Sequence, residues 1–389
     1  MERNIAELKR QFSQVFGEGG KVHIVRAPGR VNLIGEHTDY NDGFVFPVAV
    51  EMEVIIVFRG RDDGKLRFAS TAYPGDIDEF DIDSTITPRP KHWSNYARGI
   101  AFNFQDAGVT LVGMDALILN TLPVGSGLSS SAAILIGTAL AMLALTGLKM
   151  DLTRVAMLAH KTENDFVGLP CGVMDQTIVA TGKPGFAMLL DCRDLSKSYV
   201  AMDPKELRIV IANTMMPHSL PGGEYAERRK DCEEAVRFFQ KTHPSVRALR
   251  DVTLDMVKHA EGELDSRLLN RARHVVSEIA RTQEAATLLG KRRYEEVGEL
   301  MLQSHRSLQK DYEVSSPELD CLVDEAMKVK GVYGARLTGA GLGGCIVALV
   351  QPRAVDELKK QLPLAYQQKF GKTPDIYVTG ASAGASMLE

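Results

Sequence analysis

The chain has 389 residues, of which 44% are hydrophobic and 25% are charged, an ordinary composition for a globular protein of roughly two or three domains. Its net charge of -4 excludes a basic field that would attract nucleic acid or anionic lipid. The five cysteines are widely spaced without a C-x-x-C pair, which argues against a disulfide framework or a zinc site and favours thiols in a reducing cytoplasm. The start, MERNIAELKRQF, is charged and amphipathic, so we expect no secretory signal.

The first half mixes strand-like and helix-like patterns. KVHIVRA predicts a strand, and EMEVIIVFRGRDDGKLRFAS predicts a β-hairpin around an Asp-Asp-Gly turn. Residues 115–120 predict another strand, which is followed by a long helix from about Ser129 and a further helix over 151–167. The pattern lacks the regular βαβ rhythm of a doubly wound sheet.

The stretch from Ala132 to Leu148 carries no charged residue and approaches the length of a membrane span, about 17–25 residues. It has no flanking Lys/Arg cluster, no aromatic belt and no second candidate span. We therefore expect a helix that is buried on all sides within a domain.

A polar, irregular segment at 191–206 predicts a domain boundary, which divides the chain into residues 1–205 and 206–389. Beyond it, LRIVIAN predicts a strand and mostly helical sequence continues to about Lys330. The end of the chain predicts a strand, a helix and a strand, at 345–350, 354–362 and 375–380.

PVGSGLSSSAA, residues 123–133, is the strongest local signal. Two glycines permit close approach of a ligand, the run of three serines from Ser129 to Ser131 supplies hydroxyls, and the start of the long helix presents its free N–H groups and positive dipole end. The segment predicts a phosphate loop, although it is not a Walker A loop because no Gly-Lys-Ser/Thr follows. The alternative is a flexible loop that caps a core helix.

Glu163 falls in the middle of the apolar face of the helix predicted over 151–167. A carboxylate there is costly unless it is paired, hydrogen-bonded or bound to a metal ion. The alternative is a helix end at which the side chain reaches water, since Gly168 and Pro170 follow soon after.

Two other patterns favour structural interpretations. RLTGAGLGGCIVALV contains a formal G-x-G-x-x-G, but it continues into a strand rather than a helix, so it predicts a tight turn and not a dinucleotide site. On helical spacing alone, Tyr225 shares a face with Cys232 and Phe239 and is a core residue. The histidines at 160, 259, 274 and 305 form no H-x-x-x-H pair and do not predict a metal site.

PGRVNLIGEHTDYNDG, residues 28–43, places many hydrogen-bonding groups between apolar segments and is either a solvated loop or a polar site. This stretch resembles the signature of the galactokinases, and PVGSGLSSSAA resembles the phosphate loop of the wider group of galactose, homoserine, mevalonate and phosphomevalonate (GHMP) kinases. ENDFVGLPCGVMDQ, ANTMMPHSLPGGEYAERR and LTGAGLGGC resemble three more galactokinase segments, in the same order. The resemblance extends from about residue 20 to the C-terminus.

The resemblance implies an α+β fold with a ribosomal-protein-S5-like N-terminal domain, a ferredoxin-like C-terminal domain and an active site between them. It implies transfer of the γ-phosphoryl of ATP, with Mg²⁺, to the C1 hydroxyl of α-D-galactose, the first committed step of galactose metabolism. It also implies a monomer that binds neither nucleic acid nor membrane and that works in the cytoplasm.

The resemblance assigns Asp175 as the base and Arg30 as the residue that keeps it ionised and stabilises the transition state. The implied sugar-binding residues are Glu36, His37, Thr38, Asp39 and Tyr225. The implied phosphate-loop residues are Gly125, Ser126, Gly127, Leu128, Ser129, Ser130 and Ser131. Ser131 and Glu163 are the implied Mg²⁺ ligands, and Ser70 is expected near the adenine with Trp93 on the same side.

The chain departs from the family pattern beside the expected sugar pocket, at Asp42, Pro217, the Pro221-Gly222-Gly223 run, Ala226 and Leu342. These departures leave two alternatives open. One is a sister anomeric kinase for N-acetylgalactosamine, arabinose or galacturonate. The other is a non-catalytic sensor of galactose and ATP, which the intact serine run and Asp175 disfavour.

Overall fold

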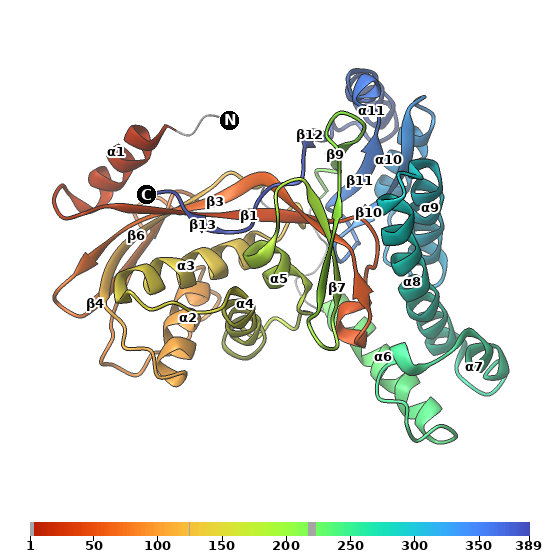
Figure 1. The fold of residues 1–389 in the computed structure, drawn as a ribbon, viewed down its shortest axis with the longest axis horizontal. Helices are drawn as coiled ribbons and strands as arrows, with labels where there is room; N and C mark the ends of the chain where they lie inside the picture. The colour runs from red at the N-terminus through yellow and green to blue at the C-terminus, as the bar shows by residue number, and fades with distance from the viewer. Residues whose placement is uncertain (1–3, 124, 217–222) are drawn as a thin grey trace.

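A computed structural model describes residues 4–123, 125–216 and 223–389, and within them the fold contains three β-sheets flanked by helices (Figure 1). The predicted mixed α+β class is confirmed. The large sheet has six strands, in the spatial order β13 (Ser386–Met387), β1 (His23–Asn32), β3 (Pro47–Arg61), β6 (Gly113–Asn120), β4 (Lys65–Ser70) and β5 (Ile77–Asp81).

Both faces of the large sheet are covered because its strands alternate apolar side chains between them. Ile24 faces α1 (Ile5–Phe16), while its neighbour Val25 faces the opposite core. That opposite core lies against α2 (Asn95–Asp106), α3 (Ser130–Thr146), α4 (Leu152–Lys161) and α5 (Met174–Thr181). Figure 1 shows α1 on one side of the sheet and these four helices on the other.

The predicted hairpin over residues 51–70 is wrong. The chain does reverse after Arg61, but β6 lies between β3 and β4, antiparallel to β3 and parallel to β4. A Cβ atom at Gly113, where β6 enters, would lie 2.9 Å from the carbonyl oxygen of Arg61 and 3.1 Å from that of Lys65. A turn sequence sets the reversal of the chain, whereas a strand from elsewhere decides the pairing.

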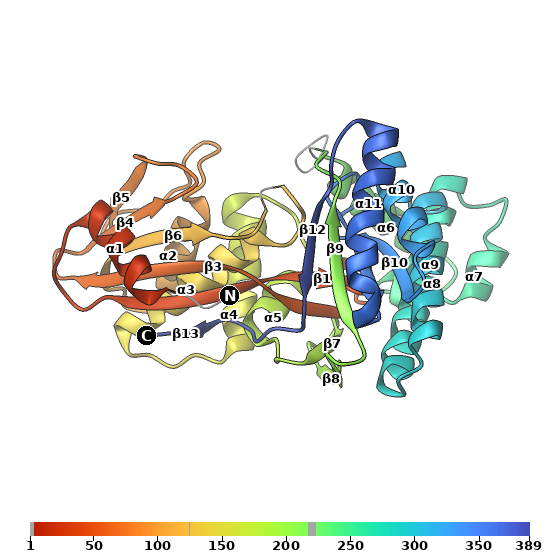
Figure 2. The ribbon, with the colours of Figure 1, turned by 90° about the horizontal axis from the view of Figure 1, so that it is seen from above.

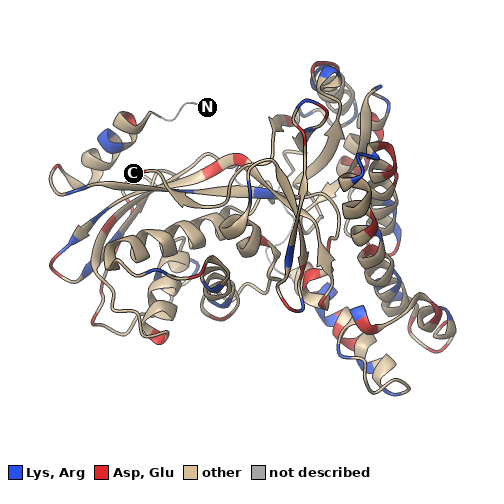
Figure 3. Ribbon diagram, in the orientation of Figure 1, with Lys and Arg blue, Asp and Glu red and all other residues tan. Residues whose placement is uncertain are grey.

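The uncharged stretch from Ala132 forms α3 as far as Thr146, and its last residue, Leu148, is exposed; α3 packs against β1, β3 and the neighbouring helices. Its residues from Ala132 to Leu143 are largely buried, as expected for a central helix. In Figure 3 the ribbon of α3 is tan, without the colours of charged residues, whereas both signs of charge are mixed along the outer helices. Among the described residues, no helix combines the length and apolarity that crossing a bilayer requires.

The second sheet is formed by four antiparallel strands, β10 (Val332–Thr338), β11 (Cys345–Val350), β9 (Arg208–Asn213) and β12 (Asp375–Thr379). The predicted strands at 345–350 and 375–380 are confirmed, and the helix predicted at 354–362 is longer than expected. The helices of this half are α6 (Gly223–Gln240), α7 (Leu254–His259), α8 (Ser266–Gly290), α9 (Tyr294–Lys310), α10 (Pro317–Met327) and α11 (Val355–Phe370). A third sheet joins β2 (Phe44–Val45), β7 (Phe186–Asp191) and β8 (Lys197–Ala201).

The predicted division between residues 205 and 206 falls between β8 and β9 and stays a prediction. After β12 the chain returns to the large sheet, where β13 pairs with β1 (Figure 2). The backbone carbonyls of Ala383 and Gly384 accept hydrogen bonds from Arg26 of β1. The last residues therefore connect the second half of the chain to the first.

Candidate active site

A cleft of about 430 Å³ lies where the two halves meet, and a smaller cavity of about 180 Å³ continues from it. Arg30, His37, Asp175 and Tyr225 line both. The larger cleft also contains the glycine-serine loop, and the smaller one contains Glu36, Asp39 and Glu163. Predicted site residues from distant parts of the sequence therefore lie around one continuous cleft. The glycine-serine loop lines one end of this cleft, and the carboxylates of the smaller cavity form its polar end.

The glycine-serine loop leads directly into α3. Gly125 and Gly127 have φ angles of 69° and 72°, which glycine adopts without strain. Ser129 precedes the helix in a left-handed conformation, and its side chain does not cap the helix. The N–H groups of the first turn of α3 and its positive dipole end therefore face the cleft, as anion binding requires.

Arg30 is aimed at the cleft by an irregularity in β1. The register of β1 against β3 shifts between Pro28 and Arg30, and the chain comes so close to the loop that a Cβ atom at Gly29 would lie 2.8 Å from the carbonyl oxygen of Leu128. The Arg30 N–H donates to the same carbonyl at 3.1 Å. The bulge thus places an arginine beside the glycine-serine loop.

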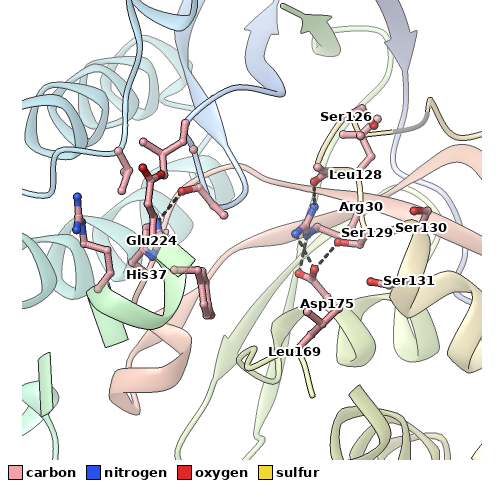
Figure 4. A pocket seen from close by; sticks show the side chains of 18 of the residues that line it. Arg30, His37, Ser126, Leu128, Ser129, Ser130, Ser131, Leu169, Asp175 and Glu224 are labelled. Carbon is pink, nitrogen blue, oxygen red and sulfur yellow. Dashed lines mark hydrogen bonds and ion pairs between the residues drawn. The ribbon is translucent and has the colours of Figure 1, made fainter. Parts of the chain in front are cut away.

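Asp175 lies in the first turn of α5 and binds Arg30 through two parallel hydrogen bonds of 2.7 Å (Figure 4). The Ser129 hydroxyl donates a third hydrogen bond to its Oδ2. The Asp175 side chain is 26% exposed and faces the cleft, while Arg30 is nearly buried. A guanidinium, a hydroxyl and a helix N-terminus therefore surround the carboxylate.

Two carboxylates of the 28–43 segment point into the smaller cavity. Glu36 accepts hydrogen bonds at its Oε1 from the Gly339 N–H at 2.7 Å and from Arg336 at 3.3 Å. Burial raises the pKa of Glu36, and the charges of Arg336 and Arg30 oppose that rise. Burial and the charges of Asp175 and Glu36 raise the pKa of Asp39 to about 7.

Tyr225 lies in the first turn of α6 and lines both cavities, so the core interpretation drawn from its spacing is wrong. Its ring contacts those of His37 and Tyr40, with centroids 5.7 and 5.2 Å away. His37 has a φ of 61°, and both of its ring nitrogens have protein partners, the Tyr40 hydroxyl and the Ala340 carbonyl.

Glu163 is buried, as the periodicity indicated, in a π-helical turn (Thr162–Val167) that continues α4. Gln176 donates to its Oε2 at 2.6 Å. Burial raises the pKa of Glu163 to about 7, against the hydrogen bond from Ser131 that lowers it. Among the described residues, no group of three His, Cys, Asp or Glu side chains is placed to hold a metal ion, so a cation here needs further oxygen ligands from a substrate.

Three predicted residues lie outside the polar end of the cleft. The Thr38 hydroxyl is fully buried and donates to the carbonyls of Gly35 and Phe44, so it holds the loop in shape. Ser70 is buried and does not line the cleft; its hydroxyl accepts from the Ala72 N–H. Trp93 stacks on Tyr73, which follows Ser70 closely in the chain.

The structure also shows where the residues that depart from the family pattern lie. Asp42 follows the turn at Asp39–Asn41 in a left-handed conformation and pairs with Arg193 at the surface, so it is a turn residue that points away from the site. Leu342 lines the cleft and Ala226 is exposed. Pro217, Pro221 and Gly222 lie outside the described residues.

Sequence reasoning missed three residues that hold the site together. A Cβ atom at Gly172 would lie 1.8 Å from Oδ2 of Asp39, so any other residue there must displace the Asp39 side chain. Arg336 is fully buried beside Glu36, and its charge within an apolar strand was a signal of the kind used for Glu163. Glu278 of α8 accepts the Gly35 N–H at 2.9 Å, and nothing in its spacing signalled that contact.

Comparisons with known families agree with this geometry. Residues 95–183 match the family of GHMP kinase N-terminal domains, and residues 285–368 match that of GHMP kinase C-terminal domains. Residues 10–60 match the galactokinase galactose-binding signature. The fold and the cleft thus define a kinase of the GHMP class.

Individual relatives narrow the class. The chain is 44% identical to a galactokinase of Roseiflexus sp. (strain RS-1), over 98% of this chain and 97% of that protein. It superposes on a crystal structure of Lactococcus lactis galactokinase complexed with galactose with a TM-score of 0.95 and 35% identity, covering 99% and 100% of the two chains. A mevalonate kinase structure shares the fold, with a TM-score of 0.67 and 19% identity over 92% and 98% of the chains. The chain belongs to the galactokinase family.

Proposed function

We propose that this cleft carries out the galactokinase reaction, transfer of the γ-phosphoryl of ATP to the C1 hydroxyl of galactose, with Asp175 as the base. The observation that carries the proposal is the Arg30–Asp175–Ser129 cluster, which lies between the glycine-serine loop and the cavity that contains Glu36 and Asp39. A base at this point can reach a hydroxyl at the polar end and face a phosphoryl group at the loop end.

Arg30 has two functions in this proposal. Its bidentate contact holds the Asp175 carboxylate in place, where it accepts the proton of the sugar hydroxyl. Its positive charge beside the loop also stabilises charge on the group in transfer. Ser129 donates to Asp175 and orients the carboxylate to accept the proton.

The phosphate groups of ATP bind the loop from Gly125 to Ser131 through backbone N–H groups and the N-terminus of α3. Ser131 and Glu163 fit a Mg²⁺ ion, because a nearly buried carboxylate whose pKa is raised to about 7 gains a counter-charge from the cation. When bound, such an ion would supply positive charge that neutralises the phosphate groups.

The sugar binds in the smaller cavity, where Glu36 and Asp39 accept hydrogen bonds from its hydroxyls and Tyr225 forms one wall. The alternative is a sister anomeric kinase, because Leu342 and Ala226 depart from the family near the pocket. Asp42 no longer supports that alternative, since it faces Arg193 at the surface. We place the protein in the cytoplasm as a monomer, with its two domains divided at residues 205 and 206.

A coupled ADP-release assay across monosaccharides tests the substrate. Galactose should have the highest kcat/KM, and a markedly higher value for N-acetylgalactosamine, arabinose or galacturonate would establish the alternative. Asp175→Asn should abolish turnover and leave galactose binding detectable by calorimetry. Full activity in that variant would remove Asp175 from its role, and an inactive wild type that binds galactose and ATP would indicate the sensor.

A further inference from the structure

His37 occupies one end of a buried chain of hydrogen bonds at the sugar end of the cleft. Its Nε2 lies 3.2 Å from the Ala340 carbonyl oxygen and its Nδ1 lies 2.7 Å from the Tyr40 hydroxyl. The Tyr40 oxygen is 2.8 Å from the Tyr312 hydroxyl, which is 3.1 Å from the Sγ of Cys232. Asn41 donates to the same sulfur at 3.5 Å.

The donor and the acceptor of each hydrogen bond in this series follow from the partner at the Ala340 end. A carbonyl oxygen only accepts, so the hydrogen between His37 and Ala340 is on Nε2. Burial and the nearby charge of His274 lower the pKa of His37 to about 3, so the ring is neutral and its Nδ1 only accepts. Tyr40 therefore donates to His37, Tyr312 donates to Tyr40, and the Cys232 thiol donates to Tyr312.

The chain of hydrogen bonds connects four segments that are distant in the sequence. His37 and Tyr40 belong to the 28–43 segment, Cys232 to α6, Tyr312 to the residues after α9, and Ala340 to the turn between β10 and β11. The Tyr225 ring also contacts those of His37 and Tyr40. A shift of the His37 ring would therefore alter its contacts with Tyr225, in the wall of the sugar pocket, and with Ala340, in the glycine turn.

The same contacts determine whether the His37 ring nitrogens can bind a ligand. Both ring nitrogens have protein partners, so neither is free for a sugar hydroxyl. Its backbone has a φ of 61°, a left-handed conformation that residues other than glycine adopt mainly where surrounding contacts stabilise it. The ring is thus placed to hold the loop against the glycine turn.

We propose that Tyr40 is a positioning residue: its hydroxyl holds the His37 ring in the Nε2–H form that binds Ala340, and this contact keeps Tyr225 and the 28–43 segment in the geometry that binds the sugar. The inference rests on the proposed function, because it assumes that galactose occupies the smaller cavity. Without the Tyr40 hydroxyl, Nδ1 has no donor, and only the 3.2 Å contact with the Ala340 carbonyl still favours Nε2–H, so the preference is weaker. In the other tautomer, Nε2 carries no hydrogen and repels the Ala340 oxygen.

The direction of the chain predicts an order of effects. Tyr40→Phe removes the group that donates to His37, whereas Tyr312→Phe leaves that donor in place. Tyr366→Phe is a matched control, since Tyr366 is also fully buried and its hydroxyl donates to the Thr214 carbonyl, away from the cleft residues. We expect the galactose KM to rise about tenfold in Tyr40→Phe, with a smaller change in kcat, and to change less than about threefold in the other two variants.

The test combines these kinetics with nitrogen NMR of the His37 ring, assigned by a His37→Gln variant and recorded without sugar. Wild type and Tyr312→Phe should show Nε2–H alone, and Tyr40→Phe should show a mixture of tautomers. A wild-type ring in the Nδ1–H form would overturn the proposal even if Tyr40→Phe does not fold. An unchanged tautomer or an unchanged galactose KM in a folded Tyr40→Phe would also overturn it, as would an equal rise in Tyr366→Phe. The tautomer is read independently of activity, so a failure of the proposed function would appear separately, as wild-type protein that does not phosphorylate galactose.

Discussion

Replacing Gly172 by alanine tests whether the position of the Asp39 carboxylate determines the affinity for the sugar. The new Cβ atom would lie 1.8 Å from Oδ2 and 2.1 Å from Cγ of Asp39, where ordinary contact begins at 3.4 Å. The carboxylate must move by about 1.5 Å to restore normal contact. Since a displacement of ~1 Å in a binding group can cost about 100-fold, we expect the galactose KM to rise between about tenfold and 100-fold, with less effect on kcat.

Steady-state kinetics and calorimetric titration with galactose measure this effect. The backbone at Gly172 is not in the left-handed region, so alanine should fold there without strain. Gly290→Ala is the matched control, because the nearest atom to its new methyl group is Val200 Cγ1 at 3.7 Å. The control should keep the wild-type galactose KM.

A double-mutant cycle identifies the cause. Asp39→Gly removes both the carboxylate and the Cβ atom, which lies 2.8 Å from the new methyl group, so adding Gly172→Ala to Asp39→Gly should change galactose affinity little further. Fully additive losses would refute the argument that Gly172 acts through Asp39. A wild-type galactose KM in the single Gly172→Ala variant would refute the role of Asp39 in sugar binding.

Three further predictions concern buried carboxylates. Because the pKa of Asp39 is raised to about 7, the carboxylate takes up a proton as pH falls below that value. The galactose KM should then rise by up to about tenfold per pH unit. The Asp39→Asn variant should show no such rise. Glu163→Gln keeps a partner for Gln176 but removes the charge for a cation, so the Mg²⁺ concentration for half-maximal rate should rise about 10–100-fold, and an unchanged Mg²⁺ requirement would contradict its role. Burial would raise the pKa of Glu278, but Arg281 and other charges lower it to about 2, so Glu278→Gln should cost about 3 kcal/mol in urea unfolding at pH 7. That difference should disappear as pH falls from 4.5 toward 2, whereas a difference independent of pH would exclude the charge as its source.

Much of the site could be predicted because its parts are local in sequence. A glycine-serine loop before an uncharged helix has few other uses, and the structure places that helix start in the cleft. Glu163 was detectable because periodicity placed a charge on an apolar face, and it is buried there. The glycine turn between β10 and β11 was distinguished from a dinucleotide motif because a strand, not a helix, follows it.

The features that escaped prediction depend on partners far away in the chain. The turn after Arg61 was correct, but β6, which begins at Gly113, decides the pairing of β3 and β4. The spacing of Tyr225 is that of a core residue; only the family resemblance implied a place at the sugar, and the structure has the side chain opposite His37, lining the cleft. Thr38 lies among the sugar residues in sequence, but its side chain turns inward to backbone carbonyls.

The sugar-binding segment depends on the second half of the chain for its shape. Gly35 is held by Glu278 of α8, Glu36 by Arg336 and Gly339 at the end of β10, and His37 by Ala340. Each contact joins residues more than 200 positions apart and fixes part of the segment that carries Glu36 and Asp39. The signature over residues 10–60 therefore identifies the family but does not form the pocket alone. Because these contacts cross the junction between the halves, any movement of one half against the other must change the affinity for the sugar as well as the path to the phosphate loop.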